Sequence, residues 1–119
     1  MAISFIGVTG DATPALAVNA TTTTQAIAQP TCQVGDLLIA FILNKELNTA
    51  TGSPVIAQDG SWTQLSQDNV DCTTAADDFR YAILYKWATA TTGNHTFTKT
   101  ADNNVVFGGC IAAFRGVDP

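Results

Sequence analysis

Strict alternation along the stretch "FRYAILYKWATA", residues 79–90, restricts what this chain can fold into more firmly than any other feature of its sequence. The odd positions form a largely aromatic face, with Phe79, Tyr81, Ile83, Tyr85 and Trp87. The even positions form a smaller, partly charged one, with Arg80, Ala82, Leu84, Lys86 and Ala88. A period of two is that of a β-strand, whose successive side chains point to opposite faces of a sheet. No window carries apolar residues at helical spacing between recognisable caps. We therefore expect an all-β fold.

Two further stretches have the character of long strands. The stretch "DLLIAFIL" is apolar on both faces, as expected for a central strand that is covered on both sides. The stretch "VVFGGCIAAF" has Gly108 and Gly109 inside a strand pattern, which indicates a bulge or a closely approaching neighbouring backbone. In all, the patterns predict about eight strands, at residues 3–8, 15–19, 24–28, 36–44, 62–66, 79–90, 94–100 and 105–115.

Turn sequences such as "GDATP", "QDGS" and "TTGN" separate these strands at short and regular intervals. This spacing is typical of a single antiparallel β-sandwich or jelly-roll-like domain over residues 1–119. The chain shows no internal repeat and no linker. Two longer stretches, "NKELNTATGSPVIAQDGS" and "SQDNVDCTTAADD", are expected to be irregular, and loops of that length are candidates for binding a partner.

The composition argues against nucleic acid and anionic membrane surfaces as partners. The formal net charge is −5, and the five basic residues are scattered along the chain. Neutralising phosphates needs clustered lysine and arginine side chains. Hydrophobic residues make up 46% of the chain and charged residues only 13%, so large weakly charged faces can meet another protein.

The N-terminal sequence and the cysteines indicate a chain that is soluble and made in a cytoplasm. The stretch "MAISFIGVTGDA" has no basic n-region, and its apolar run is too short for a signal peptide. Cys32, Cys72 and Cys110 are odd in number and widely spaced, which argues against a disulfide framework and a zinc site. We expect buried or half-buried thiols, while a bridge between Cys32 and Cys72 under oxidising conditions remains open.

No arrangement of residues points to catalysis, so we expect no catalytic residue, no cofactor and no enzyme activity. The single histidine, His95, follows a turn, and Ser53 and Ser61 are turn serines without a nucleophile-elbow context. The acidic stretch 68–78 matches no calcium-binding pattern, so we expect a solvated loop and no metal site. The aromatic residues fall at alternating positions, which favours core packing. Trp62, near a loop, is the candidate exception for stacking on a sugar.

Four pieces of the sequence, taken in order, resemble a group of bacteriophage and prophage virion proteins. They are "VGDLLIAFIL", "GSWTQL", "YAILYKWATATTGNHTFT" and "IAAFRGVDP", and they span residues 34–119. In that family the motifs belong to the scaffold: Gly35 and Asp36 open a central strand, Trp62 marks a strand after a loop, and Arg115 begins the closing motif. The resemblance implies a β-sandwich module of the kind found in phage tails, fibres and head decorations.

The resemblance also implies a role in assembly. Relatives continue past the "RGVD" motif with further strands, whereas this sequence stops at Pro119, so we expect an open sheet edge that a neighbouring strand completes. The apolar segment "AISFIGV" is the expected donor, either to its own sheet or to the next subunit, with residues 1–8 as a possible inter-subunit arm. The candidate interaction residues are Ile3, Phe5, Ile6, Trp62 and Arg115.

The function that these observations favour is a structural virion protein, and specifically a capsid decoration (cement) protein on the phage head, made in the host bacterial cytoplasm. Its expected partners are the major capsid protein and further copies of itself, as a homotrimer that bridges capsomers of the expanded head. The alternative is a tail-tip or fibre module that binds a host-surface glycan or receptor, in which Trp62 would contact the sugar. Another tail structural protein is a third possibility.

Overall fold

The computed structural model describes residues 2–10, 24–46, 55–57, 60–70, 72, 79–99 and 105–118. Within these residues the chain forms strands and no helix, which confirms the predicted all-β class. The strands are β1 (Ser4–Gly10), β2 (Thr24–Ala28), β3 (Leu37–Glu46), β4 (Val55–Ala57), β5 (Thr63–Val70), β6 (Phe79–Trp87), β7 (Asn94–Lys99) and β8 (Val105–Arg115).

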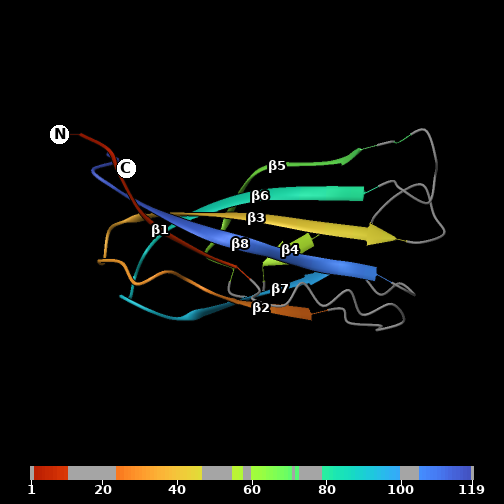
Figure 1. Cartoon of the computed structure of the whole chain (residues 1–119), viewed down its shortest axis with the longest axis horizontal. Helices are drawn as coiled ribbons and strands as arrows, with labels where there is room; N and C mark the ends of the chain where they lie inside the picture. The colour runs from red at the N-terminus through yellow and green to blue at the C-terminus, as the bar shows by residue number, and fades with distance from the viewer. Residues whose placement is uncertain are drawn as a thin grey trace.

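The strands form two antiparallel sheets packed as a β-sandwich. The larger sheet has five strands in the order β1-β8-β3-β6-β5, and the smaller has three in the order β2-β7-β4. Figure 1 shows the long strands β3, β6 and β8 running side by side, with β2 and β7 beneath them. The order places β3 at the centre of the larger sheet, as predicted for "DLLIAFIL", and places β1 and β5 at its edges.

Some strand boundaries differ from those the sequence predicts. The predicted strand 15–19 lies outside the described residues. Strand β4 lies in a stretch that was expected to be irregular, and β5 continues to Val70, into the expected acidic loop. Both are edge strands with polar or very short sequences. An edge strand has one neighbour and needs few apolar side chains, so its sequence carries a weak strand signal.

The core lies between the two sheets and is built from the even positions of β3 and β6. Leu38, Ala40 and Ile42 from β3 are fully buried, as are Ala82 and, nearly, Leu84 from β6. They pack against β8 and against the smaller sheet, which contribute Phe107, Ile111, Ala113, Ile27 and Phe97. Many of these side chains are small, so the two sheets meet over a core of modest volume.

The expectation that β3 is covered on both sides was wrong. Its odd-numbered side chains point away from the smaller sheet, and Phe41 is 39% exposed there. Core packing of the aromatic residues was likewise right only in part. Phe97 and Phe107 are buried, whereas Tyr81 and Tyr85 lie half-buried on the opposite side of the larger sheet. Alternation shows that two faces differ but does not show which of them meets the second sheet.

The N-terminal segment pairs within its own chain. Strand β1 runs antiparallel to β8, from Ser4 opposite Arg115 to Gly10 opposite Cys110, with a register shift between Phe5 and Gly7. The sequence left open whether this segment pairs with its own sheet or with the next subunit, and the structure shows it paired with its own sheet. In the described part of the chain, no other strand pairs with the far edge of β1.

Candidate functional site

One side of the larger sheet presents large apolar side chains to solvent. We call this side, opposite the smaller sheet, the outer face. Strand register and alternation assign to it Phe5, Val8, Leu37, Ile39, Phe41, Leu43, Tyr81, Ile83, Tyr85, Trp87, Ala112 and Phe114. The described part of the chain places no second layer of strands over this face.

The side chains of the outer face lie in rows that cross the strands. In the row nearest the Leu37 end of β3, Phe5 lies opposite Phe114, Phe114 opposite Leu37, and Leu37 opposite Trp87. Directly opposed side chains on one face of an antiparallel pair are within contact distance. The row is therefore a continuous apolar band across β1, β8, β3 and β6.

The exposure of these side chains is unusual for a soluble domain. Phe5 is 60% exposed, Val8 55%, Leu65 60%, Phe41 39% and Leu43 37%. Single exposed apolar residues are common, but a contiguous apolar patch of several hundred Å² marks a contact with another macromolecule. The outer face is therefore the candidate interaction site of this protein.

The relief of the outer face differs between its two halves. Over β1 and β8, the rings of Phe5 and Phe114 pack at a centroid distance of 5.7 Å and form what we call the ridge. Further along the face, the rings of Phe41 and Tyr81 stack with centroids 6.5 Å apart, and the Tyr81 hydroxyl lies 3.2 Å from Ser66 Oγ. These contacts fix the aromatic rings on the surface.

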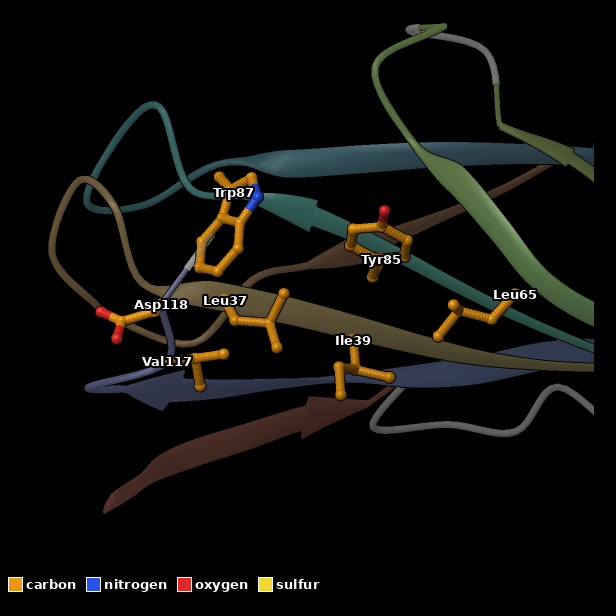
Figure 2. Close-up of a pocket in the computed structure, with 7 residues that line it drawn as sticks. All are labelled: Leu37, Ile39, Leu65, Tyr85, Trp87, Val117 and Asp118. Atoms are coloured by element: carbon orange, nitrogen blue, oxygen red, sulfur yellow. The ribbon is translucent and has the colours of Figure 1, made fainter. Parts of the chain in front are cut away.

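Over the other half, the outer face is hollowed by a depression of about 360 Å³. We call it the hollow, and Figure 2 shows the side chains of β3 and β6 at its centre. It is lined by Leu37, Ile39, Leu65, Tyr85, Trp87, Val117 and Asp118. Its lining is apolar and aromatic apart from the Asp118 carboxylate and the tyrosine hydroxyl, which suits an apolar side chain or a ring of a partner.

Charge is sparse on this surface. Asp68 lies opposite Tyr81 on the edge strand β5, and Asp118 lies beside the hollow. Lys45 holds an outer-face register position at the far end of β3, opposite Phe79. An uncharged centre with charged groups at its margin is the usual composition of a protein–protein interface.

The predicted interaction residues at the N-terminus take different positions. Phe5 belongs to the ridge. Ile3 is 66% exposed just before β1. Ile6 is partly buried against the core between the sheets, so it stabilises the fold. Of these three, Phe5 is the residue that the strand register assigns to the outer face.

Trp62 is turned toward the interior of the sandwich. Its ring packs 5.5 Å from that of Phe97 and edge-on to His95 at 5.1 Å. The Lys86 ammonium lies 5.6 Å from the Trp62 ring centre and donates to Ser61 Oγ at 2.6 Å. These contacts hold the half-buried indole against the core.

Arg115 is engaged within the chain. Its guanidinium donates to both carboxylate oxygens of Asp36, with Nε 2.9 Å from Oδ1 and Nη2 2.8 Å from Oδ2. The Gln33 backbone N–H also donates to Asp36 Oδ2 at 2.7 Å. The Arg115 hydrogen bonds lower the pKa of Asp36, although burial of the carboxyl acts in the opposite direction.

A polar cluster next to this pair involves the histidine and one cysteine. Gln29 donates through Nε2 to the Ala90 carbonyl at 2.9 Å, and its Oε1 lies 2.8 Å from His95 Nε2. Gln29 Nε2 also lies 3.3 Å from Cys32 Sγ. Burial, and then the Asp36 carboxylate, raise the pKa of the Cys32 thiol. The cluster links the 29–36 segment to the turn before β7.

All three cysteines are thiols in this structure, with Cys32 buried and Cys72 exposed. The acidic stretch 68–78 is described only at residues 68–70 and 72, so most of the predicted loop lies outside the described residues. Among the described residues, no three or more histidine, cysteine or acidic side chains gather as a metal site would require. The same residues contain no helix long and apolar enough to cross a membrane.

The sequence contains a signal for the outer face, although its alternation favours the core for the aromatic residues. The stretch "DLLIAFIL" is apolar on both faces and residues 79–87 have an aromatic side. Together they carry more large side chains than one core between two sheets can hold. Leu65 and Val117 had no such signal, because their positions on the face follow from the register shift in β5 and from the turn after β8.

No family model matches this sequence, and no curated protein or solved structure shows significant similarity to it.

Proposed function

We propose that this chain is a non-enzymatic structural protein of a bacteriophage virion, and specifically a decoration protein that binds the expanded head. In this role it associates with further copies of itself, as a trimer, and with the major capsid protein. Two features support the proposal. One is the resemblance of the motifs around Asp36, Trp62 and Arg115 to virion proteins, and the other is the exposed apolar outer face.

The single observation that carries the proposal is the exposed apolar outer face. A domain that acts alone in water gains nothing from presenting Phe5 and Leu65 at 60% exposure each. A subunit of an assembly buries such a face permanently. The motif residues Asp36 and Arg115 join the ends of β3 and β8 within the larger sheet, so their resemblance to virion modules concerns the scaffold.

The mechanism is stabilisation by binding. A protein that binds the expanded shell and not its ruptured state lowers the free energy of the intact shell by mass action. Many copies, each burying on the order of 1,500 Å² per contact, bridge neighbouring capsomers and oppose the pressure of the packaged DNA. No bond is made or broken, so no catalytic residue is needed.

Co-sedimentation tests the proposal directly. Purified protein is mixed with expanded capsids that lack it, centrifuged and imaged, with unexpanded capsids as the control. We expect saturable binding to expanded capsids at regular lattice positions, and a higher temperature of capsid rupture. Absence of binding to heads, with the protein found on tails, would refute the decoration role.

The second candidate is a tail-fibre module that binds a host glycan, and the hollow is the observation that favours it. Tyr85 and Trp87 line it together with the Asp118 carboxylate, and aromatic faces with a few polar groups suit a sugar. Glycan-array binding that Trp87→Ala abolishes while the fold stays intact would support this function. Trp62, which packs inside the sandwich, is the matched control for loss by unfolding.

A further inference from the structure

We infer that the outer face is the surface through which copies of this chain associate, with the ridge of one copy lying against the hollow of the next. This inference deepens the proposed function, from which it takes the expectation of self-association. It adds the surface, the orientation and the residues in contact.

The outer face is large enough for a stable contact. It spans five strands, of which β6 has nine residues. With strands about 4.8 Å apart and residues rising about 3.3 Å each, its flat area is roughly 700 Å². Each partner in a standard protein–protein interface contributes about 800 Å². Side-chain relief adds to the flat area, so the area buried per copy approaches that of a standard interface when its neighbours together cover the whole face.

The chemistry of the face favours a second copy as its occupant. The chain has a net charge of −5, so two copies repel each other unless they meet where charge is lacking. The outer face is such a surface, because its charged positions lie at its ends: Asp68 on the edge strand β5, Lys45 at the far end of β3, and Asp118 at one end of the hollow. A partner recognised through charge would find no complementary group at the centre, where Ile39 and Phe41 lie.

The two halves of the face differ in form. The ridge over β1 and β8 carries Phe5, which is 60% exposed, whereas the hollow lies over β3 and β6. Phe5 and Trp87 also lie in the same row across the sheet. Rotation about an axis parallel to the strands does not change the position of a residue along that axis. The ridge of one copy therefore lies level with the hollow of its neighbour.

This contact repeats head to tail. Each copy offers its ridge to one neighbour and its hollow to another, and such contacts close into a ring when the rotation permits. The trimer proposed above is a ring of this kind. Trp87, which lines the hollow and lies in the same row as Phe5, is the residue of the neighbour that the ridge reaches.

Single substitutions test the surface. The full chain, without capsids, is studied by sedimentation velocity and native mass spectrometry, with circular dichroism to confirm folding. We expect an oligomer for the wild type and about 30-fold or more weaker association for Leu65→Glu and for Phe5→Glu, the effect of placing a charge within an apolar interface. Val34→Glu is the matched control, because Val34 is 67% exposed but lies in the turn before β3.

Charge exchange tests the orientation. Phe5→Glu and Trp87→Lys are each expected to be monomeric, whereas an equimolar mixture is expected to form hetero-oligomers, since the glutamate of one chain then meets the lysine of the other. A mixture that stays monomeric overturns the contact of ridge and hollow. A wild type that is monomeric at micromolar concentration, or a Val34→Glu variant that dissociates like Leu65→Glu, overturns the surface itself.

These outcomes separate the inference from the proposed function. A monomeric wild type that binds expanded capsids overturns the inference and leaves the decoration role intact. An oligomer that Leu65→Glu dissociates, but that binds no capsid, supports the inference and refutes the decoration role.

Discussion

Arg115, at the end of β8, and Asp36, just before β3, form a two-pronged ion pair in which both hydrogen bonds are shorter than 3 Å. The glycines beside them, Gly35 at φ 90° and Gly116 at φ 79°, turn the backbone in the left-handed region that other residues rarely adopt. Two motifs 79 residues apart thus meet as one structural clamp at the end of the sandwich.

The clamp predicts a loss of stability in acid. Arg115 holds the pKa of Asp36 below its ordinary value of 3.8, so the unfolded state takes up this proton at a higher pH than the folded state. The stabilisation is therefore complete above about pH 5 and is lost as the pH falls through the lowered pKa of Asp36 in the folded state. Asp36→Asn should lower Tm by about 5 °C or more at pH 7, and its difference from the wild type should shrink as the pH falls below 3.8.

Thermal unfolding followed by circular dichroism from pH 2 to pH 7 measures this effect. Asp68→Asn is the control, since Asp68 is exposed on β5 and has no arginine partner in the described structure. Its curve should run parallel to that of the wild type. A constant difference between Asp36→Asn and the wild type down to pH 2 would show that the charge of Asp36 contributes nothing.

Replacement by alanine should change the stability of the protein very differently at the two neighbouring glycines of β8. A Cβ at Gly109 would collide with the Phe41 carbonyl and lie 2.8 Å from Ile42 Cδ1, whereas a Cβ at Gly108 would meet nothing within 4 Å. We expect Gly109→Ala to lower the free energy of unfolding by about 2 kcal/mol or more and Gly108→Ala to change it little. Urea unfolding of both variants gives the comparison, and equal effects would contradict the close approach of β8 to β3.

The same glycines show how far the sequence alone could lead. It predicted a bulge or a close backbone there; the described β3–β8 pairing shows no register shift, and the close approach at Gly109 is confirmed. It also predicted the class and the centre of the larger sheet. It missed the outer face because alternation in residues 79–87 assigns two sides to a strand without showing which side the smaller sheet covers. The hollow depends on strand order, which no local pattern contains.

Replacing Trp62 should affect folding before any binding. Its ring contacts Phe97 and His95 and lies under the Lys86 ammonium, so Trp62→Ala should lower the free energy of unfolding by about 2–3 kcal/mol. Trp62→Phe retains an aromatic ring and should lose less than about 1.5 kcal/mol. Chemical denaturation measures both. A Trp62→Ala variant as stable as the wild type would show that the indole packs loosely and is available to a ligand.

The thiols should differ sharply in reactivity. Cys32 is buried, and burial together with Asp36 raises its pKa, which lowers the fraction of reactive thiolate. Cys72 is exposed. Labelling of the native protein with a thiol reagent at pH 8 should modify Cys72 at least about 100-fold faster than Cys32. Equal rates would mean that the 29–36 segment opens readily, and the same labelling after denaturation provides the reference.

The pairing of β1 with β8 has a consequence for the order of events during synthesis. Ser4 lies opposite Arg115, and β8 also supplies one of the two neighbours of β3. While β8 is still within the ribosome, β3 can pair only with β6, and β1 has no partner in the described sheet. Contacts between such distant residues form slowly. Until β8 emerges, the nascent chain therefore leaves edges of β1 and β3 unpaired and prone to aggregation. Emergence of β8 pairs both edges and allows the larger sheet to form.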